Sequence, residues 1–304
     1  MRIVKAAGML VLAACSSQVA DLGGTSRHPG CTLPTGVGPQ VRIANFVPNA
    51  DVVDVCIRAA AGSWGEPLIL SGADCGGSAY FKSAASAGFA YGQVSIAFTA
   101  PADTVDVKLV AAGSGCSAAA LTETDGMKLN AQAVTTLLRI GGSAGVPQKI
   151  EALAENYPPD PTGIDLRFVH AMPGTAPLDF GLAPPGVTQL PTTVATLLLE
   201  SPIPFGETPA PGERTLLGNP VRSNGYIRIL AGTYAFVAGV HGQSPEQALL
   251  LLLFSSQNGA SQSLYAVGLP GNNEYPLAGY WCTEVPPPSE GANPLLLNCV
   301  RTSL

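Results

Sequence analysis

Two segments of the chain place an arginine, a proline and an aspartate at the same spacing. Residues 41–55 read VRIANFVPNADVVDV, and residues 166–180 read LRFVHAMPGTAPLDF. A guanidinium and a carboxylate are both charged at neutral pH, so such residues can form an ion pair within the fold or bind a ligand. An ungapped offset of 125 superimposes Arg42 on Arg167, Pro48 on Pro173, and Asp54 on Asp179.

In each segment the arginine and the aspartate are symmetric about the proline. An antiparallel hairpin around that proline would place Arg42 opposite Asp54 on one face. The same hairpin in the second segment would place Arg167 opposite Asp179. We therefore predict a structural ion pair in each repeat, partly buried, so that Asp179→Ala would destabilise the protein by more than about 2 kcal/mol. Ligand binding by these residues is the alternative.

His170 is the residue in the second segment that could act as a general base. A hydrolase needs a nucleophile within hydrogen-bond reach of that base, and the sequence contains no GxSxG motif. We expect His170 to be a hydrogen-bonded structural histidine, and we assign no role to His28 or His241. The sequence therefore predicts no catalytic residue, and a hydrolase remains an alternative.

Aspartates three residues apart are the only candidate metal ligands. Two such pairs on neighbouring strands could bind Ca²⁺ through carboxylate oxygens. However, no DxDxDG loop is present, and the second repeat keeps only Asp179. We expect neither a metal nor a cofactor, with calcium binding as an alternative. The pairs are Asp51 and Asp54, and Asp103 and Asp106.

Two tryptophans have different expected roles. Trp64 lies in the Gly-containing stretch AAGSWGEPL, where an exposed ring could stack on a sugar. Trp281 precedes Cys282, and we expect it to pack on a disulfide.

The N-terminus has the features of a bacterial lipoprotein leader. Arg2 and Lys5 precede an apolar stretch that ends in LAAC, and residues 1–14 are too few to span a bilayer as a helix. We predict cleavage before Cys15 and lipid attachment to its thiol. Ser16 follows instead of an aspartate, which favours the outer membrane.

Six further cysteines remain, and an even number in an exported protein indicates three disulfides. Cys282 and Cys299 stand alone near the C-terminus and are expected to pair. The other four allow three connectivities, which the sequence leaves open. Of these we favour the one with the pairs Cys56–Cys116 and Cys31–Cys75.

The composition indicates an all-β protein. The chain has 35 Gly and 27 Pro, yet 46% of its residues are apolar, as in short strands joined by turns. A net charge of −6 without a basic run argues against nucleic acid as a partner. The most apolar run, residues 248–254, is far shorter than the roughly 20 residues that a membrane-spanning helix needs.

Strands are expected where apolar residues alternate between turn signals. In the first repeat they lie near 40–47, 51–58, 89–98, 104–112, 132–140 and 148–155. In the second they lie near 164–171, 177–183, 225–231, 233–241, 247–254, 262–268 and 275–282. The predicted organisation is a signal peptide (1–14), a lipidated tether (15–39), a first β-sandwich (40–157), a linker (158–163), a second β-sandwich (164–285) and a disulfide-closed tail (286–304).

The repeated segment, the AYGQ at residues 90–93 and the AGTY at residues 231–234 together resemble the domain of unknown function 4397. That family occurs in tandem in bacterial exported proteins and lipoproteins. The resemblance covers residues 40 to about 285 and implies β-sandwich modules, here taken as immunoglobulin-like, with no assigned reaction. The first copy departs from the pattern where Asn45 replaces the histidine matched by His170.

The sequence therefore predicts a non-catalytic lipoprotein of the cell envelope. Its tandem sandwiches would serve as an interaction, adhesion or structural module, held at the membrane by lipid, with an envelope protein or a glycan as partner. The alternative is a module that binds a glycan, a small ligand or calcium.

Overall fold

The computed structural model confirms an all-β fold. The described residues form strands and turns without a helix, and none of them forms a helix that could cross a membrane. Cys15, Cys31 and Cys75 lie outside the described residues. These are 38–65, 67, 88–95, 98–131, 134–143, 145–155, 162–183, 196–197, 199, 201–213, 220–243, 249–256, 258–284 and 299–303.

Two sheets form the first sandwich. Its inner sheet has the order β3-β1-β7-β8, with β4 also paired to β1, and its outer sheet has the order β2-β5-β6. The inner strands are β1 (Gln40–Asn45), β3 (Gln93–Val94), β4 (Phe98–Thr99), β7 (Val134–Ile140) and β8 (Lys149–Ala154). The outer strands are β2 (Val53–Ala59), β5 (Thr104–Ala111) and β6 (Thr122–Lys128).

The second sandwich repeats this arrangement. Its inner sheet has the order β12-β9-β15-β16-β17, and its outer sheet has the order β11-β10-β13-β14. The inner strands are β9 (Ile164–Ala171), β12 (Tyr226–Ile229), β15 (Ala260–Val267), β16 (Ala278–Glu284) and β17 (Cys299–Ser303). The outer strands are β10 (Leu178–Ala183), β11 (Thr196–Leu197), β13 (Gly232–Val240) and β14 (Leu250–Ser256).

Strand pairing in the inner sheets is the same in both halves. β1 pairs parallel with β7, and β9 pairs parallel with β15. The turns that cross the ends of β1 and β9 also correspond: Gly92 N donates to Asn45 O, and Gly206 N donates to His170 O, each at 2.7 Å. AYGQ and its counterpart PFGE therefore occupy equivalent places.

Alternation along the strands determines which side chains fill each core. Val41 and Ile43 of β1 pack against Val53 and Val55 of β2 inside the first sandwich. In the second sandwich, Phe168, Phe180 and Phe236 stack with centroids 5.1–5.5 Å apart. Burial of these rings and aliphatic side chains is the main stabilising contribution to each sandwich.

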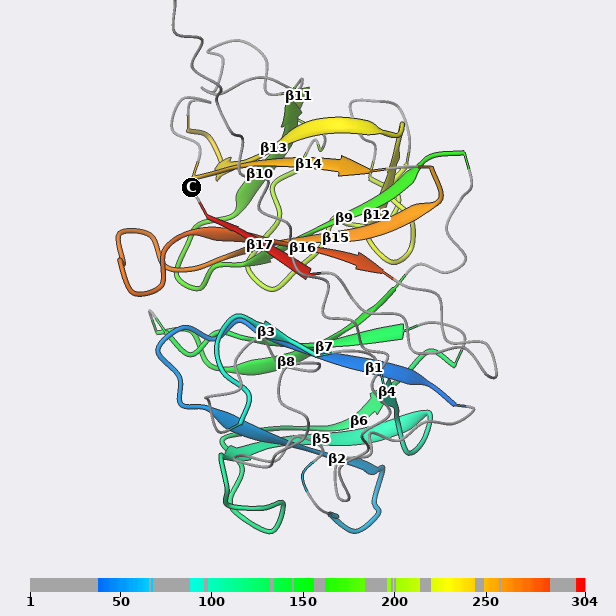
Figure 1. Ribbon diagram of the computed structural model, residues 1–304, viewed down its shortest axis with the longest axis vertical. Coiled ribbons are helices and arrows are strands. Elements are labelled where there is room, and N and C mark those ends of the chain that lie inside the picture. The colour runs from blue at the N-terminus through cyan, green and yellow to red at the C-terminus, as the bar shows by residue number, and fades with distance from the viewer. Residues whose placement is uncertain are drawn as a thin grey trace, which may run out of the picture.

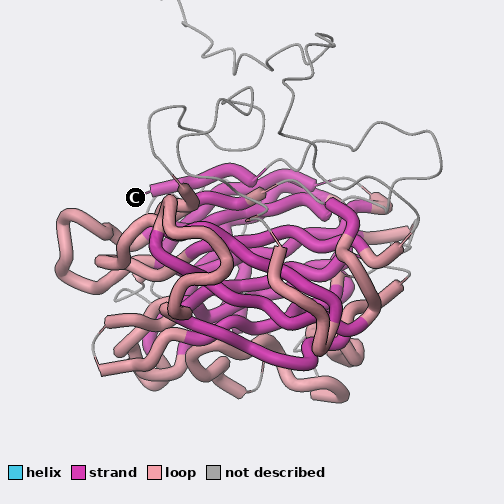
Figure 2. Tube along the Cα trace, turned by 90° about the horizontal axis from the view of Figure 1, so that it is seen from below, coloured by secondary structure: helices cyan, strands magenta, loops and turns pink. Residues whose placement is uncertain are grey.

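The two inner sheets pack against each other, so the molecule is a stack of four β layers (Figure 1). The opposite face of β1 carries Ala44 and Phe46 into an apolar cluster shared with the second sandwich. Phe46 lies 5.2 Å from Tyr265 and 4.8 Å from Tyr280 between ring centroids. Figure 2 looks along the stack and shows loops gathered at both ends of the strands.

Three expectations for the strands require correction. The strand expected at 89–98 is two short strands, β3 and β4, which both pair with β1. β6 and the two-residue strand β11 were not predicted. The C-terminal tail, expected to be a loop, contains β17, which pairs with β16.

The predicted hairpin around each proline is wrong. β1 and β2 belong to different sheets of the first sandwich, and β9 and β10 belong to different sheets of the second. The segment between each pair crosses from the inner to the outer sheet. An arginine on β1 and an aspartate on β2 are therefore not cross-strand neighbours.

Candidate functional site

Arg42 forms a buried ion pair with a carboxylate that the sequence did not indicate. Its Nε lies 2.7 Å from Glu155 Oε1, and the two side chains are 0% and 2% exposed. Nε also donates to Thr136 Oγ1 at 2.6 Å, and that hydroxyl donates to the same carboxylate oxygen at 2.9 Å. Glu155 directly follows β8, so three elements of the inner sheet contribute to this network.

Arg167 occupies the equivalent position in the second sandwich. Its Nε donates to Ser263 Oγ at 3.0 Å, as Arg42 does to Thr136. Its Nη1 donates to Ala154 O on β8 at 2.6 Å, across the boundary between the sandwiches. The guanidinium also lies 4.5 Å from the ring centroid of Tyr226. Arg167 therefore links the two halves of the molecule.

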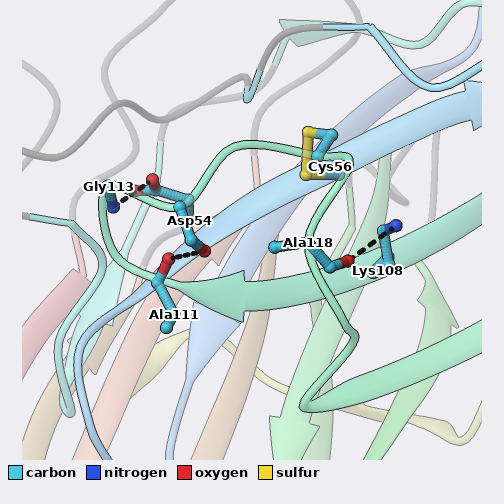
Figure 3. The surroundings of a disulfide bond; sticks show 8 residues. Asp54, Cys56, Lys108, Ala111, Gly113 and Ala118 are labelled. Atoms are coloured by element: carbon cyan, nitrogen blue, oxygen red, sulfur yellow. Dashed lines mark hydrogen bonds between the residues drawn. A yellow bond between two sulfur atoms is a disulfide. The ribbon is translucent and has the colours of Figure 1, made fainter.

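The two aspartates of the motif have other partners. Asp54 Oδ2 accepts a hydrogen bond of 2.7 Å from Gly113 N, in the loop after β5 (Figure 3). Asp179 pairs with His241 at 2.9 Å, where the two side chains are 23% and 56% exposed. An exposed pair contributes only about 0–1 kcal/mol to stability, so the large cost predicted for Asp179→Ala no longer has a basis.

His170 is a structural residue of the turn that follows β9. Its Nδ1 accepts from Met172 N at 3.2 Å, so Nε2 carries the proton and donates to Ala176 O at 3.3 Å. Asn45 serves the same purpose in the first sandwich, where its Oδ1 accepts from Val47 N at 3.2 Å. The Asn-for-His difference between the repeats therefore preserves one hydrogen bond, and both ring nitrogens of His170 contact backbone groups.

Burial lowers the pKa of His170 from 6.5 to about 4, so the ring is neutral in the folded protein at neutral pH. As the pH falls, His170 binds a proton in the unfolded chain before it does so in the folded protein. The free energy of unfolding therefore decreases as the pH falls below 6.5. Lowering the pH from 7 to 5 should cost about 2 kcal/mol through this group. His170→Asn should remove that part of the pH dependence, as measured by urea unfolding at both pH values. An unchanged pH dependence in the variant would contradict this assignment.

The aspartates considered for calcium include one that is fully engaged by protein donors. Asp106 Oδ2 accepts from Arg58 Nε at 2.8 Å and from Ala61 N at 3.2 Å, and Oδ1 accepts from Gly126 N at 2.9 Å. The Gly126 N–H, followed by Arg58, holds the pKa of Asp106 below its usual value. No group of three His, Cys, Asp or Glu residues suited to a metal occurs among the described residues.

The predicted disulfide between Cys56 and Cys116 is confirmed (Figure 3). Trp64 packs on it, together with Val110, on the side of the outer sheet that faces away from the core. The Arg58 guanidinium and the Lys108 ammonium lie 4.1 and 4.4 Å from the centroid of the Trp64 ring. Trp64 thus takes part in an intramolecular cluster.

The second tryptophan and its neighbouring cysteine point to opposite faces of β16. Trp281 packs on the core of the second sandwich, whereas Cys282 lies in the cluster between the sandwiches. Cys282 is disulfide-bonded, and the strand register places Cys299 directly opposite it. The expected stacking of Trp281 on the Cys282 sulfur is therefore wrong, and the backbone positions suit the predicted bridge to Cys299.

Most of the residues considered for catalysis or ligand binding thus form contacts that stabilise the fold. The sequence did not reveal the partner of Arg42, since Glu155 lies far along the chain, directly after β8. One available signal was the apolar pair Ala44 and Phe46. It alternates with the core residues of β1 and marks a second buried face.

A family model described as a domain of unknown function, DUF4397, matches residues 39–181. The match covers the first sandwich and continues through β9 into β10. No curated protein matches the chain.

Proposed function

Because residues 39–181 match the model of a domain of unknown function, DUF4397, for which no activity is described, we propose that this chain is a non-catalytic lipoprotein of the bacterial cell envelope. In this proposal, lipid on Cys15 holds the chain at the outer membrane. The two sandwiches serve together as an interaction, adhesion or structural module for an envelope protein or a glycan.

One observation supports the non-catalytic role above the others. The strongest candidates for chemistry, Arg42, Arg167 and His170, are buried and hydrogen-bonded to groups of the chain itself. Catalytic groups need access to a substrate, and a base needs a nucleophile within reach. Buried and occupied groups of this kind instead support a rigid body that presents its surface.

The packing between the sandwiches supports a single rigid module. An apolar cluster with the rings of Phe46, Tyr265 and Tyr280 joins the two inner sheets, and Arg167 adds a hydrogen bond across them. Interfaces that are apolar in this way restrict relative motion of domains. A module of this kind keeps the loops of both sandwiches at fixed positions relative to each other.

Anchorage is tested by metabolic labelling with radioactive palmitate. The wild-type chain should incorporate label and fractionate with outer membranes, whereas Cys15→Ala should incorporate none, because its thiol is the proposed attachment point. The double variant Cys56→Ala and Cys116→Ala is the control: it removes two cysteines that are joined in a disulfide and should keep the label. Equal labelling of wild type and Cys15→Ala would contradict the proposed anchor.

The non-catalytic role is tested separately. Purified protein should leave a panel of ester, amide and glycoside substrates unchanged. A photocrosslinking benzophenone amino acid at exposed loop positions should form adducts with a specific envelope partner when intact envelopes are irradiated. The proposal would be contradicted if the wild-type protein converted one of these substrates and His170→Ala did not. His170→Asn, which should keep the fold, serves as the control for folding.

A further inference from the structure

Strand directions place corresponding loops of both sandwiches at one end of the stack. The chain enters the first sandwich at Gln40 and leaves it after Ala154, and these residues lie at the same end of the inner sheet. The turn at Gly206, which is bonded to His170 O near the end of β9, lies against Ile140 at the end of β7. The loops after β1, β7, β9 and β15 therefore lie at the opposite end, on the left in Figure 1.

Two tyrosines from different sandwiches meet among these loops. Tyr91, in the AYGQ turn, and Tyr275, in the loop after β15, form an edge-to-face pair with centroids 5.2 Å apart. Tyr275 Oη donates to Glu274 Oε1 at 3.2 Å. Asn272 Oδ1 accepts from the N–H groups of Glu274 and Tyr275 at 2.8 and 3.1 Å, which fixes the shape of the loop.

Asn49 completes the group from the first sandwich. It is exposed, it adopts a φ of 58°, and its backbone hydrogen-bonds to Tyr275. The residues Asn49, Tyr91, Asn272, Glu274 and Tyr275 are called the tyrosine cluster below. Both tyrosine residues are partly exposed, and the hydroxyl oxygen of Tyr91 is buried.

The fold itself does not require tyrosine at these places, as the other half of the molecule shows. Leu269 N donates to Tyr275 O at 2.9 Å, and Gly142 N donates to Val146 O at 2.8 Å, so Val146 is the counterpart of Tyr275. The counterpart of Tyr91 is Phe205, whose ring packs edge-to-face on His170 with centroids 5.8 Å apart. The amphipathic pair of rings therefore occurs at one of the two equivalent places.

The chemistry of the tyrosine cluster suits a polyhydroxylated ring. Tyr and Asn side chains on a rigid scaffold give large contact area and adaptable hydrogen bonding at low entropic cost. A side-chain amide can donate a hydrogen bond to a hydroxyl or accept one from it, and a carboxylate can accept one. Glu274 and a chain charge of −6 disfavour an anionic ligand.

We propose that the tyrosine cluster binds neutral carbohydrate, with the ring pair stacking on a sugar and Asn49, Asn272 and Glu274 binding its hydroxyls. This inference rests on the proposed function, in which the sandwiches serve as an interaction module of the cell envelope. It names the class of partner that the module would engage.

The test uses saturation-transfer NMR on the detergent-solubilised full chain. The probes are cellohexaose, maltohexaose and mannohexaose, with hexagalacturonate as the anionic comparison. At least one neutral hexaose should bind, and Tyr275→Val should weaken that binding about ten-fold or more, as expected for loss of an aromatic anchor. Valine is the test substitution because Val146 fills the equivalent place. Phe205→Ala is the matched control and should bind as the wild type does.

Three outcomes would overturn the inference. The first is that no neutral hexaose binds at concentrations up to about 10 mM, far above useful dissociation constants. The second is that hexagalacturonate alone binds. The third is that wild type and Tyr275→Val bind equally well. Palmitate labelling that persists in any of these cases would leave the lipoprotein proposal standing. Release of shorter sugars from a bound hexaose would instead contradict the non-catalytic role and support the site.

Discussion

Replacing Glu155 with glutamine is expected to destabilise the protein by about 3–5 kcal/mol, because the change leaves the buried Arg42 guanidinium without its carboxylate. The loss should appear as a lower midpoint in urea unfolding followed by tryptophan fluorescence. The double variant Arg42→Met with Glu155→Leu should recover most of that loss, since paired apolar side chains of similar volume replace a buried ion pair at little net cost.

The control for this experiment is an ion pair of the same chemical kind at the surface. Lys149 and Glu151 lie 2.7 Å apart with side chains 41% and 38% exposed, so Glu151→Gln should cost at most about 1 kcal/mol. A loss of less than about 1 kcal/mol for Glu155→Gln would contradict the expectation, because the buried Arg42 guanidinium would then not depend on this carboxylate for its stability.

Removal of the disulfide by Cys56→Ala and Cys116→Ala together is expected to cost about 4 kcal/mol. The bridge joins residues separated by 60 positions, and the chain-entropy model assigns a cost of that size to a loop of this length. The double variant leaves the other cysteines unchanged, and differential scanning calorimetry against the wild type measures the loss of stability. Both cysteines are buried, which adds the loss of packing against Trp64 to the entropic term.

A second comparison separates packing from cross-linking. Trp64→Ala with the disulfide intact should cost less than the double cysteine variant, because it removes the covering ring and keeps the bridge. Equal losses of stability in the two variants would contradict the expectation that the cross-link contributes more than the ring that covers it.

The positions of most strands follow from the alternation of apolar residues. β13 was expected near 233–241 and is observed at Gly232–Val240. β6 escaped prediction because its sequence, TETDGMK, is polar and buries only Met127, so the alternation is hidden. Local pattern thus identifies a strand well when one of its faces enters a core.

Pairing between strands was much harder to predict than the strands themselves. The spacing of arginine, proline and aspartate is real, but it marks a crossing between two sheets instead of a hairpin. Local sequence specifies which residues alternate, whereas the partner of a strand depends on segments far away in the chain. Arg42 and Glu155 are brought together only by β7 and β8, which no spacing rule connects.

The candidate site shows the same division. His170 was expected to be structural, and its hydrogen bonds to the backbone confirm this. The tyrosine cluster could not be predicted, because Tyr91 and Tyr275 meet only after the two sandwiches pack face to face. A contact of that kind depends on the assembled molecule and leaves no periodic signal in either segment.

The packing of the inner sheets has a consequence for the origin of the chain. A Cβ at Gly92 would meet the hydroxyl end of Tyr280 of the second sandwich, and a Cβ at the equivalent Gly206 would meet the ammonium end of Lys149 of the first. Each half thus presents the same face to the other, as in a two-fold symmetric dimer. A single sandwich with this face would be complementary to a second copy of itself. A gene duplication that fused two copies would then inherit an existing interface, and the two halves could afterwards diverge in their loops, as Tyr275 and Val146 have.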